Sequence, residues 1–194
     1  MASYTEEQFI EDIRSAFSGT DDPREQAQTI AECMRRIIAT GWPETSEKFG
    51  PDNGVYVMHA DESTGHPDPG FMVLAYRQPA LRPDTKPAPH DHGPAFVVYG
   101  VERGSNVQTR MAWRYADDPS ARPTLEVTRS DYQAPGHVAY FLPGEIHSTK
   151  GSSEEETVYV RVTSMDLEKV KRHYYNPETG TSYTFKAATA PRPT

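Results

Sequence analysis

Two short motifs place histidines at spacings that suit a metal ion. His90 and His92 stand two residues apart, between a proline-rich stretch and an apolar run. Side chains two apart on a strand point to the same face, so both imidazoles are expected to reach one position inside a barrel. A third histidine, His147, comes far downstream in the segment 142–147, Leu-Pro-Gly-Glu-Ile-His, near a turn between two strands. We therefore predict a metal site with His90, His92 and His147 as its ligands.

Each motif also has a plainer interpretation, because a histidine pair or a turn followed by a histidine is common on protein surfaces. The other histidines, which have no partner at a metal-ligand spacing, are His59, His66, His137 and His173. We expect His66 to lie in solvent, whereas His59 and His137 could each face a cavity. The one cysteine, Cys33, excludes an intrachain disulfide and a multi-cysteine zinc site, and we expect it to be buried and unreactive.

The elements that would position these histidines are mostly strands. Apolar residues recur at helical spacing over residues 3–17, and Asp22-Pro23 is typical of the start of a helix, here one extending to about residue 40. Beyond residue 45, short apolar or alternating runs predict strands over 55–59, 71–76, 95–101, 107–115, 124–128, 137–141 and 157–163, with another at 183–185. Residues 103–106, Arg-Gly-Ser-Asn, supply a hairpin turn. This order indicates a β-sandwich or barrel preceded by two helices.

The organisation and charge of the chain narrow its function classes. We predict a helical segment at 1–45 packed on a barrel at 46–186, and a loose tail at 187–194. Among 194 residues, 28 acidic and 20 basic side chains give a net charge of −8, which argues against nucleic-acid binding. No apolar run is long enough to cross a membrane and the start lacks a secretory pattern, so we expect a cytoplasmic protein. Oligomeric state stays open, because helices or a partner chain could cover the barrel edge.

The histidine pattern within a β-rich chain resembles the cupin superfamily, over roughly residues 55–185. Within it, the chain is most similar to thiol dioxygenases of the cysteine dioxygenase type. The features that carry the resemblance are the His-Asp-His motif, Gly104 twelve residues after His92, Thr109, Ala112-Trp113 and the segment 176–180. The resemblance implies an all-β double-stranded β-helix (jelly-roll) barrel with the metal in its mouth, and Fe(II) as that metal. Ligand type alone would also admit zinc, nickel, copper or manganese.

Departures from the family pattern bear on the ligand set and the substrate. Many cupins place a glutamate ligand five residues after the second histidine, where this chain has Val97, and Glu102 lies too far along to replace it. We therefore expect three neutral imidazoles and no carboxylate, a donor set that favours a chelating anion together with dioxygen. The arginine that binds the carboxylate of cysteine in that family corresponds to Met58, and the cysteine that crosslinks to tyrosine in some members corresponds to Val97. Cysteine itself is therefore not the expected substrate.

The family's Ser-His-Tyr shell, at alternate positions on the strand after the third histidine, corresponds to Tyr159, Arg161 and Thr163. If the side chains of this strand alternate between the two faces of the sheet in the same order as in the family, all three point into the barrel. Arg161 would then bind a substrate carboxylate through two parallel hydrogen bonds, with Thr163 beside it. The alternative is a surface salt bridge from Arg161 to Glu102 or Asp131.

Three tyrosines are candidates for inward phenols. Tyr99 and Tyr159 are assigned catalytic roles in proton donation or orientation, and Tyr56 a role in substrate binding. Simple packing is the alternative for each of them.

Together these expectations describe a mononuclear non-heme iron dioxygenase, whose partners are a small anionic substrate and dioxygen. The preferred reaction oxidises a thiol carboxylate to a sulfinate. One alternative is carbon–carbon cleavage of an enolisable diketone or an oxygenated aromatic. Another is a non-catalytic cupin that binds a ligand or stores metal.

Overall fold

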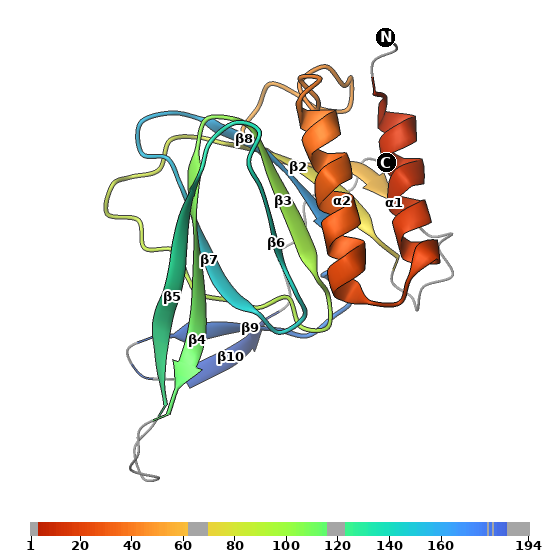
Figure 1. Ribbon diagram of the computed structural model, residues 1–194. Helices are drawn as coiled ribbons and strands as arrows, with labels where there is room; N and C mark the ends of the chain where they lie inside the picture. The colour runs from red at the N-terminus through yellow and green to blue at the C-terminus, as the bar shows by residue number, and fades with distance from the viewer. Residues whose placement is uncertain (1–3, 62–69, 116–122, 178, 180, 186–194) are drawn as a thin grey trace.

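The structure, a computed structural model, describes residues 4–61, 70–115, 123–177, 179 and 181–185. Two helices come first, α1 (Glu6–Gly19) and α2 (Pro23–Ile38) (Figure 1). The strands that follow are β1 (Gly54–Ala60), β2 (Met72–Gln78), β3 (Val97–Arg103), β4 (Asn106–Arg114), β5 (Thr124–Gln133), β6 (Val138–Phe141), β7 (Ile146–Gly151), β8 (Thr157–Thr163), β9 (Arg172–Asn176) and β10 (Thr181–Phe185). Within these residues, no helix is long and apolar enough to cross a membrane.

Both helices begin at side chains that cap their free backbone N–H groups. The hydroxyl of Thr5 accepts a hydrogen bond from the Gln8 N–H, and the Gln8 side chain accepts one from the Thr5 N–H. Asp22 accepts from the N–H of Arg24 at 2.8 Å, and Pro23 takes the first helical position, where its missing N–H costs nothing. Both predicted helices are confirmed: the second begins at Pro23 as predicted, and the other three ends differ from the predicted ranges by two or three residues.

The larger sheet, with strand order β1-β2-β8-β3-β6, separates the helices from the interior of the barrel. Alternation along β8 divides its side chains between the two faces. Val158, Val160 and Val162 are fully buried in the core cluster that contains the helices. Gly100 of β3 shares their face, and a Cβ there would lie 2.6 Å from the Cγ of Met34, so α2 packs directly on the backbone of the sheet. The opposite face of β3 and β8 therefore lines the barrel.

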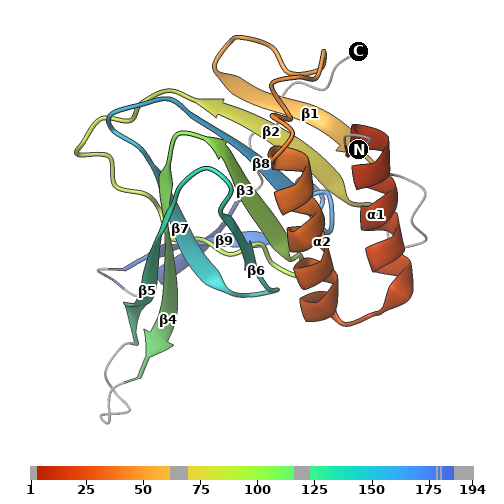
Figure 2. The ribbon, with the colours of Figure 1, turned by 45° about the horizontal axis from the view of Figure 1, so that its top comes forward.

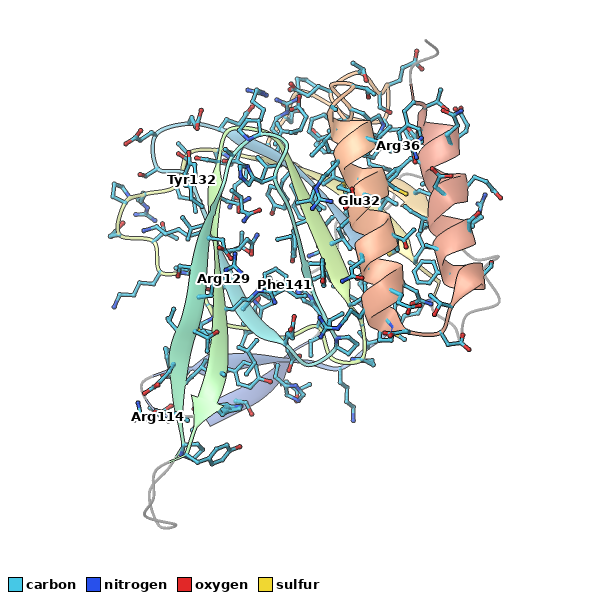
Figure 3. All side chains as sticks on the ribbon, viewed as in Figure 1. Glu32, Arg36, Arg114, Arg129, Tyr132 and Phe141 are labelled. Atoms are coloured by element: carbon cyan, nitrogen blue, oxygen red, sulfur yellow. The ribbon has the colours of Figure 1, made fainter. Side chains whose placement is uncertain are left out.

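A second sheet, with order β5-β4-β7, faces the first across the barrel, and the β9–β10 hairpin lies at one end (Figures 1 and 2). A smaller core cluster fills the space on the barrel side of the larger sheet: Ala95, Val97, Tyr99, Phe141 and Leu167. β5 is an edge strand, and Tyr132 projects from it on the side away from the helices (Figure 3). The expected fold is confirmed: an all-β double-stranded β-helix barrel carrying two N-terminal helices.

Every run that was predicted to be a strand contributes to one, and the Arg103–Asn106 turn connects β3 to β4 as predicted. Gly104 in this turn has φ +72°, and a Cβ there would lie 2.3 Å from the backbone oxygen of Glu156. The sequence did not predict β7 and β9. The domain boundaries at 45 and 186 stay predictions, and the expected loose tail at 187–194 lies outside the described residues.

Candidate metal centre

Three histidines from two distant parts of the chain converge inside the barrel. His90, His92 and His147 each offer one ring nitrogen, and these nitrogens all lie within 4.8 Å of one another. The Nε2 atoms of His92 and His147 are 2.9 Å apart. Both of these rings are buried, with 2% and 0% of their surface exposed. Lone pairs from several buried imidazoles that meet at one point form a donor set for a divalent metal ion.

The ligand segment, which we define as residues 89–93, lies between β7 and β9. His90 exchanges two backbone hydrogen bonds with His147 of β7, at 2.8 and 2.9 Å, and bridges to Tyr174 of β9 on its other side. His90 and His92 were expected to share the face of a regular strand, whereas the structure places them in an extended segment that ends in a turn before β3. Gly93 makes this turn with φ +59°, and a Cβ there would lie 2.1 Å from the backbone oxygen of Lys171. The rings still converge because the segment is extended at this point.

Hydrogen bonds to the second ring nitrogen leave Nε2 of two of these histidines free to bind metal. The Nδ1 of His147 lies 3.2 Å from Oε1 of Gln108, an oxygen that also accepts a hydrogen bond from Thr149 at 2.8 Å. Nδ1 of His90 lies 3.0 Å from the backbone oxygen of Ala88. Each of these oxygens can only accept, so each Nδ1 carries the proton and each Nε2 keeps its lone pair. This arrangement of an oriented neutral imidazole is typical of metal ligands.

The environment keeps all three imidazoles uncharged. Burial, reinforced by the neighbouring histidines, holds the pKa of His92 and His147 well below its ordinary value, and burial also lowers the pKa of His90. The positive charge of Arg161 acts in the same direction on all three rings. Phe141 closes one side, stacking on His147 with ring centroids 3.8 Å apart. The cluster is therefore in the state that binds a metal at neutral pH.

No carboxylate joins the cluster among the described residues. Val97, where many cupins have a glutamate, is fully buried beside Tyr99 and Phe141 in the barrel-side cluster. Glu102 lies elsewhere: burial and the charge of Glu44 raise its pKa, and its other charged neighbours are Arg77 and Arg103. The donor set is thus three neutral nitrogens, which suits iron, cobalt, nickel, copper or zinc.

The inner face of β8 brings an arginine next to this cluster. Arg161 forms a hydrogen bond with the hydroxyl of Tyr99, and that hydroxyl lies 3.4 Å from Nε2 of His92. The Nε of Arg161 is buried and has no hydrogen-bond partner among the described residues. The predicted inward orientation of Arg161 is therefore what the structure has. The alternative of a surface salt bridge is wrong, because Asp131 pairs with Arg129 instead and Glu102 lies on another face.

Tyrosines and a threonine lie beside Arg161 on the barrel-side face of the larger sheet. Tyr159 stacks on Tyr76 of β2 with ring centroids 4.5 Å apart, and Arg161 lies over the other ring of the pair, 5.1 Å from the centroid of Tyr76. Burial raises the pKa of Tyr99, and raises that of Tyr159 well above its ordinary value, so both phenols keep their protons. Thr163 is 1% exposed, and its hydroxyl is unpartnered within the part of the chain that the structure describes.

Tyr56 was predicted to face the substrate, and this prediction is wrong. Its strand pairs Tyr56 with Ala75, a residue of the helix-side cluster. The Tyr56 ring packs edge-on against Phe49, with centroids 4.8 Å apart, and its hydroxyl donates to the backbone oxygen of Asp52 at 2.6 Å. The register of β1 therefore turns this side chain away from the histidines.

Of the remaining histidines, two lie apart from the cluster, one lies outside the described residues, and His173 contacts Asp91, the residue between His90 and His92. His59 contacts Asp61 at 3.3 Å and Phe71 in the helix-side core, and His137 is exposed in the turn before β6. His66 lies outside the described residues. Cys33 is buried, 4.0 Å from Asp12, and burial raises the pKa of its thiol, as expected of an unreactive cysteine.

Sequence reasoning missed four residues of the site. Gln108 contacts a ligand histidine, and Asp91 contacts His173. Tyr76 stacks on Tyr159, and Arg172 of β9 is close enough to Arg161 for the two charges to interact. The one available signal was position: Asp91 lies between two predicted ligands, and Gln108 is a polar residue in a strand that enters the barrel.

Neither a protein-family model nor a curated protein sequence matches the chain. Solved structures similar to it include a protein with a double-stranded β-helix domain from Klebsiella pneumoniae, at 15% identity and TM-score 0.41, covering 73% of this chain and 88% of that one. A cupin protein from Bacteroides fragilis has 16% identity and TM-score 0.35, covering 50% and 66%. An L-ribose isomerase from Cellulomonas parahominis has 14% identity and TM-score 0.43, covering 59% and 61%. Similarity at this level concerns the path of the chain and not its activity. It extends to cupin and double-stranded β-helix proteins, and the narrower resemblance to cysteine dioxygenases stays a prediction.

Proposed function

We propose that this protein is a mononuclear metal-dependent dioxygenase, with Fe(II) as its metal, that oxidises a small thiol carboxylate to a sulfinate. One observation carries the proposal: three neutral imidazoles converge next to a buried arginine, and no carboxylate of the described residues joins them. A centre of this kind keeps the full positive charge of its metal and has room for several further ligands. An anionic chelating substrate suits both the metal and the arginine.

The metal, when bound, supplies a coordination position for the thiolate and the activation of dioxygen. Both atoms of dioxygen end on sulfur, since RS⁻ + O₂ gives RSO₂⁻, and no separate reductant is consumed. The residues of the chain bind the substrate, orient the reacting oxygen and exclude water. Arg161 holds the carboxylate of the substrate through its planar fork, and Tyr99, hydrogen-bonded to Arg161 and near the ligand nitrogen of His92, orients or protonates the reacting oxygen. Phe141 and Val97 exclude water.

The proposal is tested by measuring oxygen uptake on iron-loaded protein with three sets of compounds. These are thiol carboxylates of increasing chain length, the corresponding thiols without a carboxylate, and enolisable diketones. We expect one dioxygen consumed per sulfinate formed, with the thiol carboxylates preferred. Preference for the diketones would replace the reaction by carbon–carbon cleavage, and no uptake with any compound would favour a non-catalytic cupin.

Substitutions test which residues bind the metal and which residue binds the carboxylate of the substrate. Replacing His90, His92 or His147 by Ala should abolish stoichiometric iron binding with little change in circular dichroism; full iron occupancy in any of them would remove that residue from the ligand set.

Arg161→Lys keeps the charge but loses the fork, so KM for thiol carboxylates should rise about 10- to 100-fold, from the loss of about 1.5–3 kcal/mol in a charged hydrogen bond. Arg103→Lys, at an arginine paired with Glu44 and Glu156, is the matched control. Equal changes in KM for thiols with and without a carboxylate would exclude Arg161 as the anchor.

A further inference from the structure

Asp91, between two of the ligand histidines, points away from them and receives hydrogen bonds from its own turn and from β9. Its Oδ1 accepts from the N–H of Gly93 at 2.9 Å and from the N–H of His173 at 3.1 Å. Its Oδ2 accepts from the hydroxyl of Tyr175 and lies 3.1 Å from Nδ1 of His173. The residue is 4% exposed. One carboxylate thus joins the ligand segment to β9 through three contacts, and a fourth contact, from Gly93, holds its own turn.

Backbone hydrogen bonds extend this junction along the ligand segment. The N–H of Asp91 donates to the oxygen of His173 at 3.1 Å, and the N–H of Tyr175 donates to the oxygen of Pro89 at 2.9 Å. The ligand segment therefore acts as a short additional strand between β7 and β9. Alternation along an extended segment directs Asp91 outward and the rings of His90 and His92 inward. Any shift of the Asp91 backbone would move both rings together.

The carboxylate is in its charged form. The hydroxyl of Tyr175 and the N–H groups of Gly93 and His173 all donate to its two oxygens, and a carboxylate that accepts several hydrogen bonds is stabilised in its charged form. Hydrogen bonds to a charged acceptor are about twice as strong as neutral ones, so this junction is firmer than the two backbone bonds alone. It lies outside the expected coordination sphere, since the metal-facing nitrogens are on the inner side.

We propose that Asp91 is a positioning residue for the metal centre: its carboxylate fixes the ligand segment against β9 and thereby sets the affinity and geometry of the metal site. The inference rests on the proposed function only in that the three histidines bind a metal. A merely structural role would lower the stability of the protein without changing how the folded protein binds metal. A positioning role changes the binding of metal in protein that remains folded.

The test is titration of the metal-free protein with Co(II), whose visible absorption reports coordination geometry. Asp91→Asn keeps the shape and loses the charge, so we expect Co(II) to bind about 10- to 100-fold more weakly and its absorption bands to change. Asp61→Asn is the matched control, because Asp61 is also 4% exposed and hydrogen-bonded to Arg14, but on the helix side of the sheet. Thermal unfolding of both metal-free variants shows whether they are folded to the same extent.

Wild-type affinity and an unchanged spectrum in Asp91→Asn would overturn the proposal, as would an equal weakening in Asp61→Asn. If Asp91→Asn does not fold, Tyr175→Phe and His173→Gln decide, since each removes one contact to Oδ2: weaker Co(II) binding supports the proposal and unchanged binding refutes it. The readout needs no catalysis. Iron-loaded wild-type protein without oxygen uptake would therefore defeat the proposed function and leave this inference standing, whereas wild-type protein that binds no Co(II) would defeat both.

Discussion

Acid should destabilise the metal-free protein in a pH range set by the histidine cluster. His92 and His147 are almost fully buried, and burial holds the pKa of both rings well below its ordinary value. In the unfolded chain, the same rings take up protons at about pH 6.5. Below that pH the unfolded state binds protons that the folded state does not, so the free energy of unfolding falls as the pH falls. The free energy of unfolding stops falling only at a pH below the pKa values of these two histidines in the folded protein.

The size of this effect follows from the number of buried rings. One proton of difference changes the free energy of unfolding by about 1.36 kcal/mol per pH unit, so His92 and His147 together give about 2.7 kcal/mol per unit. His90, whose pKa burial also lowers, adds to this slope. Domains are stable by only about 5–15 kcal/mol, so two pH units remove a large share of the total.

The assay is urea unfolding at steps between pH 7.5 and 5 in the presence of a chelator. His92→Gln and His147→Gln should each reduce the slope by about one proton. Ile30→Val, at a fully buried position of α2, should lower the free energy of unfolding by about 0.5–1.5 kcal/mol at every pH and leave the slope unchanged. A wild-type slope below one proton between pH 6.5 and 5.5 would refute the reasoning, because the folded rings would then be accepting protons.

Three further outcomes are expected. Tyr99→Phe should lower kcat for oxygen uptake by about 100-fold, since the hydroxyl is proposed to orient or protonate the reacting oxygen; an unchanged kcat would assign Tyr99 to packing. Gly104→Ala should destabilise the protein by more than about 1 kcal/mol, because its φ of +72° and the oxygen of Glu156 leave no room for a Cβ, and Tm should fall by at least about 2 °C. Removing metal with a chelator should lower the free energy of unfolding by about 2.7 kcal/mol relative to protein with free metal at 100 times Kd, and equal Tm values would show that no specific site is filled.

The histidine cluster was predictable because its spacing is local. His90 and His92 lie two residues apart, and His147 follows a Pro-Gly turn, which are patterns visible in a single sequence. The strand that carries His147 was not predictable. In β7, Ile146 is the only apolar side chain before four polar ones, and the first two of these, His147 and Ser148, are buried only because the two sheets enclose them. β9 is similar, since its residues Arg-His-Tyr-Tyr-Asn show no alternation of apolar and polar side chains.

The mistaken prediction for Tyr56 has a different cause. Residues 55–58, Val-Tyr-Val-Met, are apolar at consecutive positions, so their pattern does not show which face meets the helices. The face is decided by pairing with β2, where Tyr56 lies opposite Ala75, and by a bulge between Val57 and His59. The pairing of distant strands thus fixes a side chain's direction where composition leaves it open.

The positioning residues were hidden by distance along the chain. Asp91 binds His173, 82 residues away, and Gln108 contacts His147, 39 residues away. Each of these polar side chains is unremarkable in its local segment. Their partners are identified only once the barrel has brought β4, β7, β9 and the ligand segment together.

One positive charge connects the two halves of the site. Arg161 lowers the pKa of all three ligand histidines, so it helps to keep their nitrogens available for a metal. In the proposed function the same guanidinium attracts an anion to the position beside Tyr99, and it keeps its charge at any working pH. A carboxylate residue in its place would have the opposite effect on both counts, favouring protonated histidines and repelling an anionic substrate. The absence of an acidic ligand among the described residues and the presence of a buried arginine are therefore both consistent with the proposed function, in which a metal centre of neutral nitrogens receives an anion.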